Sequence, residues 1–477
     1  MADSPSLSDR ADERPGRRPG PPRVLLLNPP GDKLYIRDYY CSFSSKASYY
    51  WPPQDLIYLS GVLDGSFEVR VLDAVVRRLC PEACLDEILA LAPAAVVFTT
   101  GTATARSDLD FIGRLKARLP RARIIASAGV LKFLGREFLE AHPDVDAALL
   151  DFGESDVVGY LEGRPGPWKS LLVREGGRIV ASEAPLGQTY RVPVPRHDLF
   201  DFKAYRIPIA KRFPFTVVVT SLGCPFRCGF CTAGAFGYRI RPADNVLPEL
   251  RRLRELGLRE ILFQDPTFTI NPRRVADLCR GMLAEGLGFT WSANAHLQAL
   301  DEEMVVVLKK AGCHTLSVGI ESGDDGMLEK YSKKTTTAEI VSKVGLLRRH
   351  KIKVLGYFIL GLPGETRATA ERTIALARSL PLDIASFAIA TPDLGTRLRA
   401  EALERGWIPP GLEAWDSTDF PLMESGGLSR EDIWALRKKA VRSFYLRPAY
   451  ILRKLGGVRS PRDIASLVGN ALSLLSK

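Results

Sequence analysis

The sequence contains no run of 18 apolar residues, so we expect no membrane-spanning helix. Residues 1–22 also lack the apolar stretch of a secretory signal peptide, and their prolines, glycines and arginines predict a disordered leader. Cysteine is scarce, with eight in 477 residues, and three of the eight lie in one short loop. Such cysteine usage suits a compartment in which thiols stay reduced, and we predict a cytoplasmic protein.

The composition is that of a globular protein, with 46% hydrophobic and 25% charged residues. The length predicts two or three domains. The net charge is +11, and residues 429–477 carry much of it, with eleven lysines or arginines against three acidic residues. This basic C-terminal region, 409–477, contains amphipathic segments at 433–450 and 464–475. They can lie on an anionic membrane or form a helical cap packed on the rest of the protein. No nucleic-acid-binding module accompanies the charge, so no nucleic acid is expected as a partner.

Residues 23–163 alternate short apolar runs with helical patterns, which predicts a doubly wound parallel sheet. The predicted strands are 24–27, 68–72, 94–100, 124–126 and 147–150, and the predicted helices are 81–91, 105–119 and 131–141. Ligands bind such sheets beyond the carboxyl ends of the strands. The polar and glycine-containing loops there suit a large polar cofactor, with Asn28, Pro29, Thr99, Thr100, Gly101, Ser127, Gly129, Gly153 and Glu154 as candidate contacts.

An aromatic insertion at 39–51 follows the first predicted strand. Its rings can face a substrate or pack two domains together, and the sequence favours neither. Residues 164–212 form a predicted linker that contains a β-hairpin at 171–180 and a proline-rich extended stretch.

Residues 213–408 repeat the alternation of strands and helices and predict six β/α units. The predicted strands are 215–219, 260–264, 290–293, 315–319, 354–360 and 384–390, with helices at 246–256, 273–285, 302–311, 337–350 and 368–379. In parallel barrels the chemistry lies at the carboxyl ends of the strands.

Cys224, Cys228 and Cys231 follow the first of these strands, on a loop that contains glycine and proline. Three thiolates at this spacing can converge on one soft metal centre. A structural zinc site is the alternative, but it needs a fourth ligand, and the next cysteine or histidine is Cys279. A four-iron, four-sulfur cluster held by three cysteines keeps one iron open.

This loop resembles the signature of the radical S-adenosylmethionine (SAM) family. The resemblance implies a partial (β/α)6 barrel, a cluster on the three catalytic cysteines, and SAM bound to the open iron and cleaved to a 5'-deoxyadenosyl radical. It also implies cofactor contacts from residues that match the family's later motifs: Phe230, Asp265, Glu321, Ser322, Ile359 and Gly361.

With the domain upstream, the chain is similar to the cobalamin-dependent radical SAM subfamily. Gly153-Glu154-Ser155 resembles that subfamily's Gly-Glu-Gly-Glu stretch but departs from it at Ser155. No Asp-x-His-x-x-Gly stretch is present, so that motif supplies no histidine ligand to cobalt. The alternative to a cobalamin-binding domain is a domain of the same fold that binds no cobalamin. Similarity to hopanoid-associated and magnesium-protoporphyrin-cyclase-like members implies a hydrophobic substrate, lipid-like or polycyclic.

The resemblance predicts an enzyme that methylates an unactivated carbon of a small molecule and takes electrons from a donor such as flavodoxin or ferredoxin. A rearrangement, cyclisation or oxidation is the first alternative, and a non-enzymatic cobalamin or iron–sulfur binding protein is the second. A methylthiotransferase is disfavoured because no small basic β-barrel module follows residue 410. His296 and His314 are candidates for substrate contact, whereas Cys41, Cys80, Cys84, Cys279 and Cys313 are expected to be buried thiols.

Overall fold

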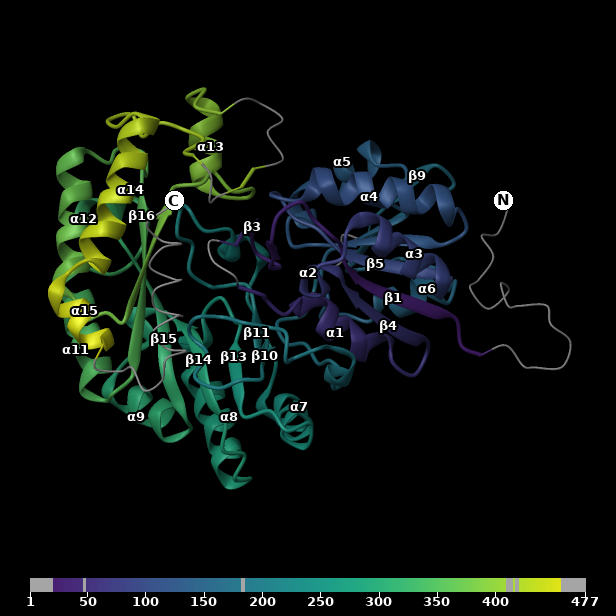
Figure 1. The fold of residues 1–477 in the computed structure, drawn as a ribbon, viewed down its shortest axis with the longest axis horizontal. Coiled ribbons are helices and arrows are strands. Elements are labelled where there is room, and N and C mark those ends of the chain that lie inside the picture. The colour runs from purple at the N-terminus through teal and green to yellow at the C-terminus, as the bar shows by residue number, and fades with distance from the viewer. Residues whose placement is uncertain (1–19, 46–48, 182–184, 409–414, 417–419, 456–477) are drawn as a thin grey trace, which may run out of the picture.

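The computed structural model describes residues 20–45, 49–181, 185–408, 415–416 and 420–455, which form two α/β units placed side by side (Figure 1). The predicted disordered leader falls almost entirely on residues outside this description, and the predicted helix at 464–475 falls wholly outside it. Within the described ranges, no helix is long and apolar enough to cross a membrane.

The N-terminal unit is built on a seven-stranded sheet in the order β4-β1-β5-β6-β7-β8-β9. Five strands are parallel, as predicted: β1 (Arg23–Asn28), β4 (Glu68–Asp73), β5 (Ala95–Thr99), β6 (Arg123–Ser127) and β7 (Ala147–Leu149). The chain crosses from β1 to β4 on one side and then returns to β5 on the other. The loops after β1 and β5 therefore diverge, which creates a switch point at the carboxyl edge, where such sheets bind ligands.

The predicted hairpin is present as β8 (Leu171–Glu175) and β9 (Arg178–Val180), but its assignment to a linker was wrong. β8 pairs antiparallel with β7 and extends the sheet. Leu171 and Val173 are buried in this position, so the hairpin covers an apolar edge strand that would otherwise be open to solvent.

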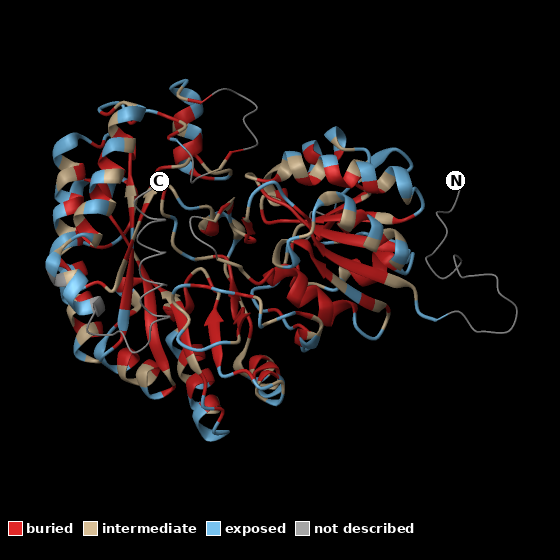
Figure 2. Ribbon diagram, in the orientation of Figure 1, coloured by how far each residue is buried: buried red, intermediate tan, exposed pale blue. Residues whose placement is uncertain are grey.

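Helices α3 (Pro81–Leu91), α4 (Ala105–Arg118) and α5 (Leu131–Ala141) match their predictions closely. Helix α1 (Gln54–Leu63) was not predicted, because all ten of its residues are buried and it has no polar face to give a helical period. Two short helices complete the unit, α2 (Ala74–Arg77) and α6 (Asp156–Leu161). Figure 2 shows the strands buried between helices whose outer faces are exposed.

The aromatic insertion at 39–51 begins in the turn of a small antiparallel hairpin of β2 (Tyr35–Arg37) and β3 (Ser42–Ser44). Tyr39 packs edge-on against Phe152 of its own unit at 4.8 Å, and Tyr40 packs against Phe236 of the second unit at 5.1 Å. The Tyr40 hydroxyl also accepts a 2.8 Å hydrogen bond from the backbone N–H of Gly223. For Tyr40, therefore, the interpretation as packing between domains is confirmed.

The second unit contains a six-stranded parallel sheet whose strands follow one another in chain order. They are β10 (Phe215–Val218), β13 (Glu260–Phe263), β14 (Thr290–Ala295), β15 (Cys313–Glu321), β16 (Lys353–Leu360) and β17 (Ile384–Ile389). The five predicted helices appear within three residues of their expected bounds: α7 (Ala243–Glu255), α8 (Pro272–Ala284), α9 (Glu302–Lys310), α11 (Thr337–Arg349) and α12 (Arg367–Ser379). Shorter elements are β11 (Ser221–Leu222), β12 (Arg239–Ile240), α10 (Asp325–Lys330), α13 (Arg397–Glu404), and the 3-10 turns η2 (His197–Leu199), η3 (Thr232–Phe236), η4 (Phe268–Ile270) and η5 (Leu297–Ala299).

The predicted amphipathic segment at 433–450 is two helices, α14 (Arg430–Tyr445) and α15 (Pro448–Leu455). Ile433, Leu436, Ala440 and Phe444 of α14 are buried in the core of the second unit. The Tyr445 hydroxyl donates a 2.7 Å hydrogen bond to the Ala385 carbonyl at the start of β17. The helical-cap interpretation is therefore confirmed for α14.

A buried polar network joins the two units. Tyr58 of α1, His197 of the connecting segment, and Arg241 and Glu249 of the second unit are all inaccessible to solvent. Glu249 accepts hydrogen bonds from Arg241 and from His197, the latter at 2.8 Å, and Tyr58 Oη accepts a 2.6 Å bond from the Val219 N–H. Although burial opposes its charge, Arg241 and His197 bring the pKa of Glu249 below its usual value. These partners make a buried charge tolerable at this position.

Candidate functional site

The three cysteines lie at the carboxyl end of the second sheet, as predicted, on a loop whose ends are paired by β11 and β12. Backbone bonds shape the loop: the Cys224 N–H donates to the Ala233 carbonyl at 3.1 Å, and the Cys231 N–H donates to the Cys228 carbonyl at 3.0 Å. The Gly229 N–H donates to the Tyr331 carbonyl at 2.9 Å. The loop is thereby attached to the segment that follows α10.

The thiols are close enough to influence one another. Burial, together with the charges of Cys228 and Cys224, raises the pKa of Cys231 to about 12. Nowhere in the described ranges do three side chains of histidine, cysteine, aspartate or glutamate lie close enough to hold a single metal ion. In a four-iron cluster each thiolate binds a different iron, so the thiols need not be that close, and three of them fit such a cluster.

A glycine at the start of the loop permits its shape. Gly223 has φ of +67°, and a Cβ added there would lie 1.6 Å from the carbonyl oxygen of Gly237. A side chain at position 223 therefore meets both the unfavourable left-handed backbone and a fixed backbone atom.

We expect Gly223→Ala to lower the iron content of the reconstituted protein severalfold, because the loop has to open to admit the methyl group. The matched control is Gly257→Ala, which also has positive φ, +84°, but has no atom within 4 Å of the added Cβ. Iron and sulfide per chain measure the effect. Equal iron content in the two variants would contradict the prediction.

Glu321 ends β15 with φ of +66°, and its Oε1 accepts a 2.8 Å bond from the Lys333 ammonium. Only 7% of the Lys333 side chain is exposed. Burial opposes its charge, but the Glu321 carboxylate and the Cys228 and Cys231 thiols raise the pKa of Lys333. A fixed cation therefore lies beside the cluster loop. Lys333 was not among the predicted site residues, because it stands in a polar stretch of Ser, Lys and Thr that is typical of a solvated loop.

Asp265 is placed differently from its expected role. Its carboxylate accepts bonds from the Thr220 N–H at 2.6 Å, the Thr220 hydroxyl at 2.5 Å and the Ser221 hydroxyl at 2.8 Å, with Arg274 at 3.5 Å. The side chain is fully buried. Asp265 therefore anchors the start of the cysteine loop, and its predicted contact with SAM stays a prediction.

The remaining candidates of this unit are Phe230, Ile359, Gly361 and Ser322, and their contacts in the structure are mainly with the fold itself. Phe230 and Ile359 both pack against one apolar cluster that contains Tyr331 and Leu398. Gly361, with φ of +86°, donates its N–H to the Glu365 carboxylate at 2.5 Å. Ser322 is buried, and its hydroxyl lies 3.3 Å from that of Thr373 on α12, away from the loop.

In the N-terminal unit, Asn28 uses both ends of its amide within the fold. Its Nδ2 donates to Asp73 at 2.9 Å, and its Oδ1 accepts from Arg37 at 3.0 Å and from Thr99 at 3.2 Å. Asn28 and Thr99 thus tie together the ends of β1, β4 and β5, and Pro29 is buried beside them.

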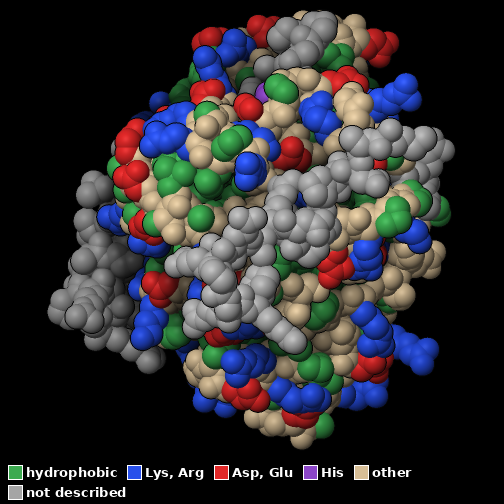
Figure 3. All heavy atoms as spheres, turned by 90° about the vertical axis from the view of Figure 1, so that its right-hand side faces the viewer, with side chains coloured by type: hydrophobic (Ala, Val, Ile, Leu, Met, Phe, Trp, Pro, Cys, Tyr) green, Lys and Arg blue, Asp and Glu red, His purple; other side chains and the backbone are tan. Residues whose placement is uncertain are grey.

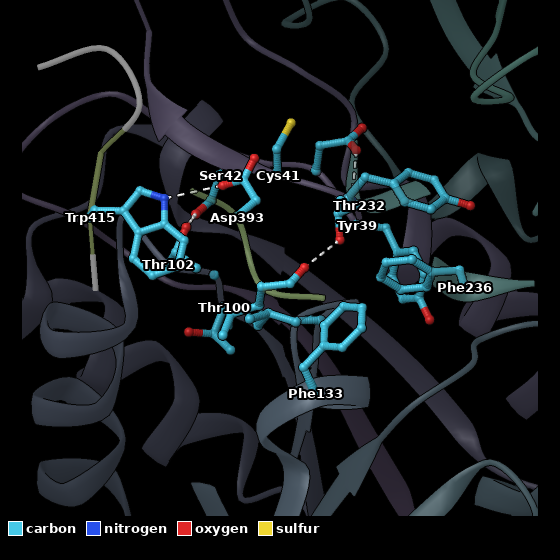
Figure 4. A pocket seen from close by; sticks show the side chains of 16 residues that line it. Tyr39, Cys41, Ser42, Thr100, Thr102, Phe133, Thr232, Phe236, Asp393 and Trp415 are labelled. Atoms are coloured by element: carbon cyan, nitrogen blue, oxygen red, sulfur yellow. Dashed lines mark hydrogen bonds between the residues drawn. The ribbon is translucent and has the colours of Figure 1, made fainter. Parts of the chain in front are cut away.

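Thr100 and Gly101 line a cavity between the two units with about 510 Å³ of empty space, part of it open to solvent (Figure 4). The cavity also receives residues of the cysteine loop and of the segment after β17. Its lining is Asp38, Tyr39, Tyr40, Cys41, Ser42, Thr100, Gly101, Thr102, Ala128, Val130, Phe133, Thr232, Phe236, Asp393, Leu394 and Trp415. The Thr100 hydroxyl is buried without a hydrogen-bond partner in the described structure, so it remains available to a ligand.

Because Gly101 and Gly129 have no side chain, the segment at 39–42 can pack directly against their loops. A Cβ on Gly101 would lie 2.5 Å from the Ser42 side chain, and one on Gly129 would lie 2.1 Å from the Tyr39 carbonyl oxygen. This segment therefore lies directly on the carboxyl edge of the sheet. Ser127 is beneath it, buried, and its hydroxyl donates a 2.7 Å bond to Asp55 at the start of α1.

Burial raises the pKa of Asp55 from 3.8 to about 7, so the folded state holds a proton that the unfolded state loses near pH 4. The stability contributed by that proton is complete below about pH 4 and is lost as the pH rises through 7. We therefore expect Asp55→Asn to raise the melting temperature relative to wild type by more at pH 8 than at pH 5. Thermal unfolding at both pH values tests this, and a constant difference would contradict it.

Gly153 and Glu154 lie at the joint between the units rather than in the cavity lining. Glu154 forms an ion pair with Arg239 of β12, and Asp151 accepts from the same guanidinium at 2.9 Å. The Gly153 N–H donates to Asp151 at 2.9 Å. The Gly-Glu-Ser turn thus fixes the N-terminal unit to the strand that closes the cysteine loop.

Cys41 is exposed and lines the cavity between the units. Tyr357 of β16 keeps 41% of its surface accessible. Burial raises the pKa of Tyr357, and the Cys41 thiol also raises it, so the two side chains are near one another. The expectation that Cys41 and Cys80 are buried was wrong, since both are exposed, whereas Cys84, Cys279 and Cys313 are buried as predicted.

Two carboxyl groups face this region. Burial raises the pKa of Asp38 and of Asp393 to about 6 each. Asp393 accepts a 3.2 Å bond from the Trp415 indole, whose backbone N–H donates to the Thr102 carbonyl at 3.0 Å (Figure 4). Asp416 accepts a 2.9 Å hydrogen bond from the Ser44 N–H. Trp415 and Asp416, from the C-terminal part of the chain, therefore close one wall of the cavity.

The two histidines differ in position. His296 stacks on Phe226 of the cysteine loop, with ring centroids 3.9 Å apart, and burial together with Lys333 lowers its pKa to about 3, so it is neutral. His314 lies at the start of β15, bonded to Glu260 at 2.8 Å. The expectation that His314 can touch substrate was wrong, because it lies at the opposite end of the sheet from the cysteine loop.

The sequence matches the Radical SAM superfamily over residues 218–377. It is 31% identical over 419 residues to an uncharacterized methyltransferase of Pyrococcus horikoshii, covering 85% of this chain and 90% of the relative. It is 26% identical over 440 residues to the anaerobic magnesium-protoporphyrin IX monomethyl ester cyclase of Cereibacter sphaeroides, covering 87% and 70%.

Two solved structures share the fold over most of the chain. The radical S-adenosylmethionine methyltransferase TsrM from Kitasatospora setae, with cobalamin and a 4Fe-4S cluster bound, aligns with a TM-score of 0.65 at 20% identity, covering 81% of this chain and 78% of TsrM. The cobalamin-dependent S-adenosylmethionine radical enzyme OxsB, with aqua-cobalamin and S-adenosylmethionine bound, aligns with a TM-score of 0.70 at 14% identity, covering 95% and 72%.

Proposed function

Because this chain belongs to the radical SAM superfamily and is 31% identical to a methyltransferase, we propose that it is a cobalamin-dependent radical SAM methyltransferase acting on an unactivated carbon. The six-stranded sheet, within residues 213–408, is then the family's partial barrel. The N-terminal sheet, which runs from β1 to β9 and so extends past residue 163 to Val180, is its cobalamin-binding domain, and residues 181–212 connect the two.

The observation that carries the proposal is the shared cavity. Thr100 and Gly101, at the switch point of the first sheet, line the same cavity as Thr232 and Phe236, which directly follow the last cysteine. A ligand held on the carboxyl edge of the first sheet therefore faces the cluster loop. Cobalamin and the cluster can act on one substrate only if they meet in this way.

Cys224, Cys228 and Cys231 would hold the cluster, and Lys333 with Glu321 would bind the charged amino-acid end of SAM. When bound, the cluster and SAM supply a radical that removes a hydrogen atom from carbon, and cobalamin supplies the methyl group. The protein itself would orient the substrate and the cofactors and would exclude water from the site. The wall formed by Trp415 would shield the cavity from water, and His296 stacked on Phe226 would cover part of the cysteine loop.

We propose a small hydrophobic substrate, lipid-like or polycyclic, which also bears a hydrogen-bond donor for Asp38 or Asp393. The aromatic walls from Phe133, Phe236 and Trp415 support the first part, and the two carboxyls support the second. A reduced flavodoxin or ferredoxin would supply the electron, and the free thiols suit a cytoplasmic location.

A ring-forming reaction is the second candidate, because the chain is 26% identical to the magnesium-protoporphyrin IX monomethyl ester cyclase over 87% of its length. The two reactions differ in the fate of the SAM methyl group. Only a methyltransferase places that methyl group in the product.

Anaerobic reconstitution with iron, sulfide and cobalamin tests the proposal. We expect bound cobalamin by visible absorbance, 5'-deoxyadenosine after reduction, and isotope-labelled methyl in products formed in extracts of cells that lack the protein. Cys231→Ser should abolish SAM cleavage, and Cys80→Ser, at an exposed cysteine outside the site, should leave it intact. Formation of 5'-deoxyadenosine without bound cobalamin would contradict methyl transfer.

A further inference from the structure

A basic groove lies on the outside of the second unit, between α12 and the junction of α14 with α15. About 980 Å³ of empty space, largely open to solvent, is associated with it. Its lining consists of Ala375, Arg378, Ser379, Arg442, Ser443, Leu446, Arg447 and Pro448. The groove is separate from the cavity between the units, with which it shares no lining residue.

The groove carries uncompensated positive charge. Arg378, Arg442 and Arg447 line it and Arg453 lies next to Arg447, and within the described part of the chain none of the four forms an ion pair with a carboxylate. Arginines near helix C-termini balance the helix dipole, and the ends of α12 and α14 supply roughly half a negative charge each. Four guanidiniums against about one negative charge leave an excess of about three positive charges.

Arg447 is held in place without being neutralised. It lies over the Phe444 ring at 4.1 Å from the centroid and donates to the Arg378 carbonyl. Burial lowers its pKa, and the neighbouring charges of Arg453 and Arg378 lower it further. Its Nε is buried and has no hydrogen-bond partner among the described residues. Arg447 is therefore a fixed guanidinium at the groove that no carboxylate of the described residues neutralises, and charge-assisted hydrogen bonds from such a group favour an anion.

Exposed aliphatic side chains adjoin the arginines. Leu446, in the groove, is 51% exposed, and Leu452 is 69% exposed. Pro448 lines the groove, and Leu452 stands four residues later on α15, so both lie on the same face of that helix. In contrast, lysines and arginines mix with acidic side chains on the face of the N-terminal unit seen in Figure 3. Arginines and leucines together are typical of surfaces that lie on anionic membranes.

The position of the groove excludes an electron-donor protein as its natural occupant. Tyr445 and Tyr450 bond to the carbonyls of Ala385 and Asp383, at the amino end of β17. The cysteine loop lies at the other end of the sheet, roughly 23 Å away along a strand such as β16 (Figure 1). A carrier docked here would hold its electron far from the cluster.

We propose that this groove binds the phosphate groups of anionic phospholipids, with Leu446 and Leu452 entering the headgroup layer. The enzyme thereby sits on a membrane surface through the end of the second unit that faces away from the cluster. This site is independent of the reaction assigned to the cofactors.

Co-sedimentation of the full chain with vesicles tests the proposal. We expect wild type to bind phosphatidylglycerol vesicles, to bind phosphatidylcholine vesicles weakly, and to dissociate as salt is raised. Each arginine near an anionic membrane changes the partition of a protein between water and membrane by about fivefold. The double variant with Arg378→Gln and Arg442→Gln should therefore bind the vesicles roughly thirtyfold more weakly than wild type. Leu452→Ser should weaken it about tenfold.

The matched control is Arg252→Gln with Arg280→Gln, which removes the same charge from exposed positions on α7 and α8. We expect less than a threefold effect from it. No binding of wild type to phosphatidylglycerol vesicles, or equal losses in the two double variants, would overturn the proposal. Full release by millimolar inorganic phosphate at constant ionic strength would assign the site to free phosphate and also overturn it. Binding of an acidic protein such as flavodoxin in the groove, without binding of vesicles, would overturn it as well.

Discussion

Lys333→Met should lower the rate of 5'-deoxyadenosine formation by two to three orders of magnitude while leaving the iron content of the protein unchanged. The Lys333 ammonium is buried, lies 2.8 Å from Glu321, and is the cation that adjoins Cys228 and Cys231. Preorganised charges in a water-excluded site contribute on this scale when they meet charge on the substrate or cofactor. Methionine keeps the length of the side chain and removes its charge.

Lys334→Met provides the control, because Lys334 is the exposed neighbour of Lys333 in the same loop. We expect wild-type SAM affinity and turnover from it. SAM binding, measured by equilibrium dialysis of the reconstituted protein, should be weaker in Lys333→Met, which separates a lost contact from a lost cluster. If both lysine variants cleave SAM at the wild-type rate, Lys333 has no part in cofactor binding.

Glu249→Gln should destabilise the protein by about 3–5 kcal/mol, the range found when one partner of a buried ion pair is removed. The change leaves the Arg241 guanidinium charged, inaccessible to solvent and without its counter-ion, and it replaces one of the two acceptor oxygens by an NH2 group, so Arg241 and His197 cannot both keep their bonds. Because Tyr58, His197 and Arg241 come from three parts of the chain, the loss should weaken the joint between the units.

The midpoint of urea unfolding measures this effect, read from tryptophan fluorescence. Glu285→Gln is the control, since it breaks an ion pair with Arg251 that is partly exposed at the surface. A surface pair contributes little, so its midpoint should stay close to that of wild type. Similar midpoints for the two variants would show that the buried network does not stabilise the joint.

The sequence analysis predicted the parallel strands well because their apolar runs end at glycine, proline or polar residues. Helix α1 escaped it because a helix buried on every side has no polar face. The hairpin of β8 and β9 was recognised, but its pairing with Leu149 of β7 depends on a contact between distant parts of the chain that no local pattern reveals.

The candidate site was predictable where chemistry depends on residue type. Three cysteines at short spacing pointed to the cluster, and the strand ends pointed to the cavity. Lys333 was not predictable, since its burial comes from Glu321 and the cysteine loop folding over it. Asp265 shows the converse. A carboxylate at a strand end suggests a ligand contact, but here Thr220, Ser221 and Arg274 surround it.

Because Trp415 lies far along the chain, its wall of the cavity forms after the first sheet has been synthesised. Its backbone bond to Thr102 and its indole bond to Asp393 form a wall that cannot exist until the ribosome has added 313 residues after Thr102. At about 5–20 residues per second, that interval is roughly 15–60 s. Throughout it the carboxyl edge of the first sheet lacks this wall, so the nascent chain offers a large cofactor a wider approach than the finished protein does.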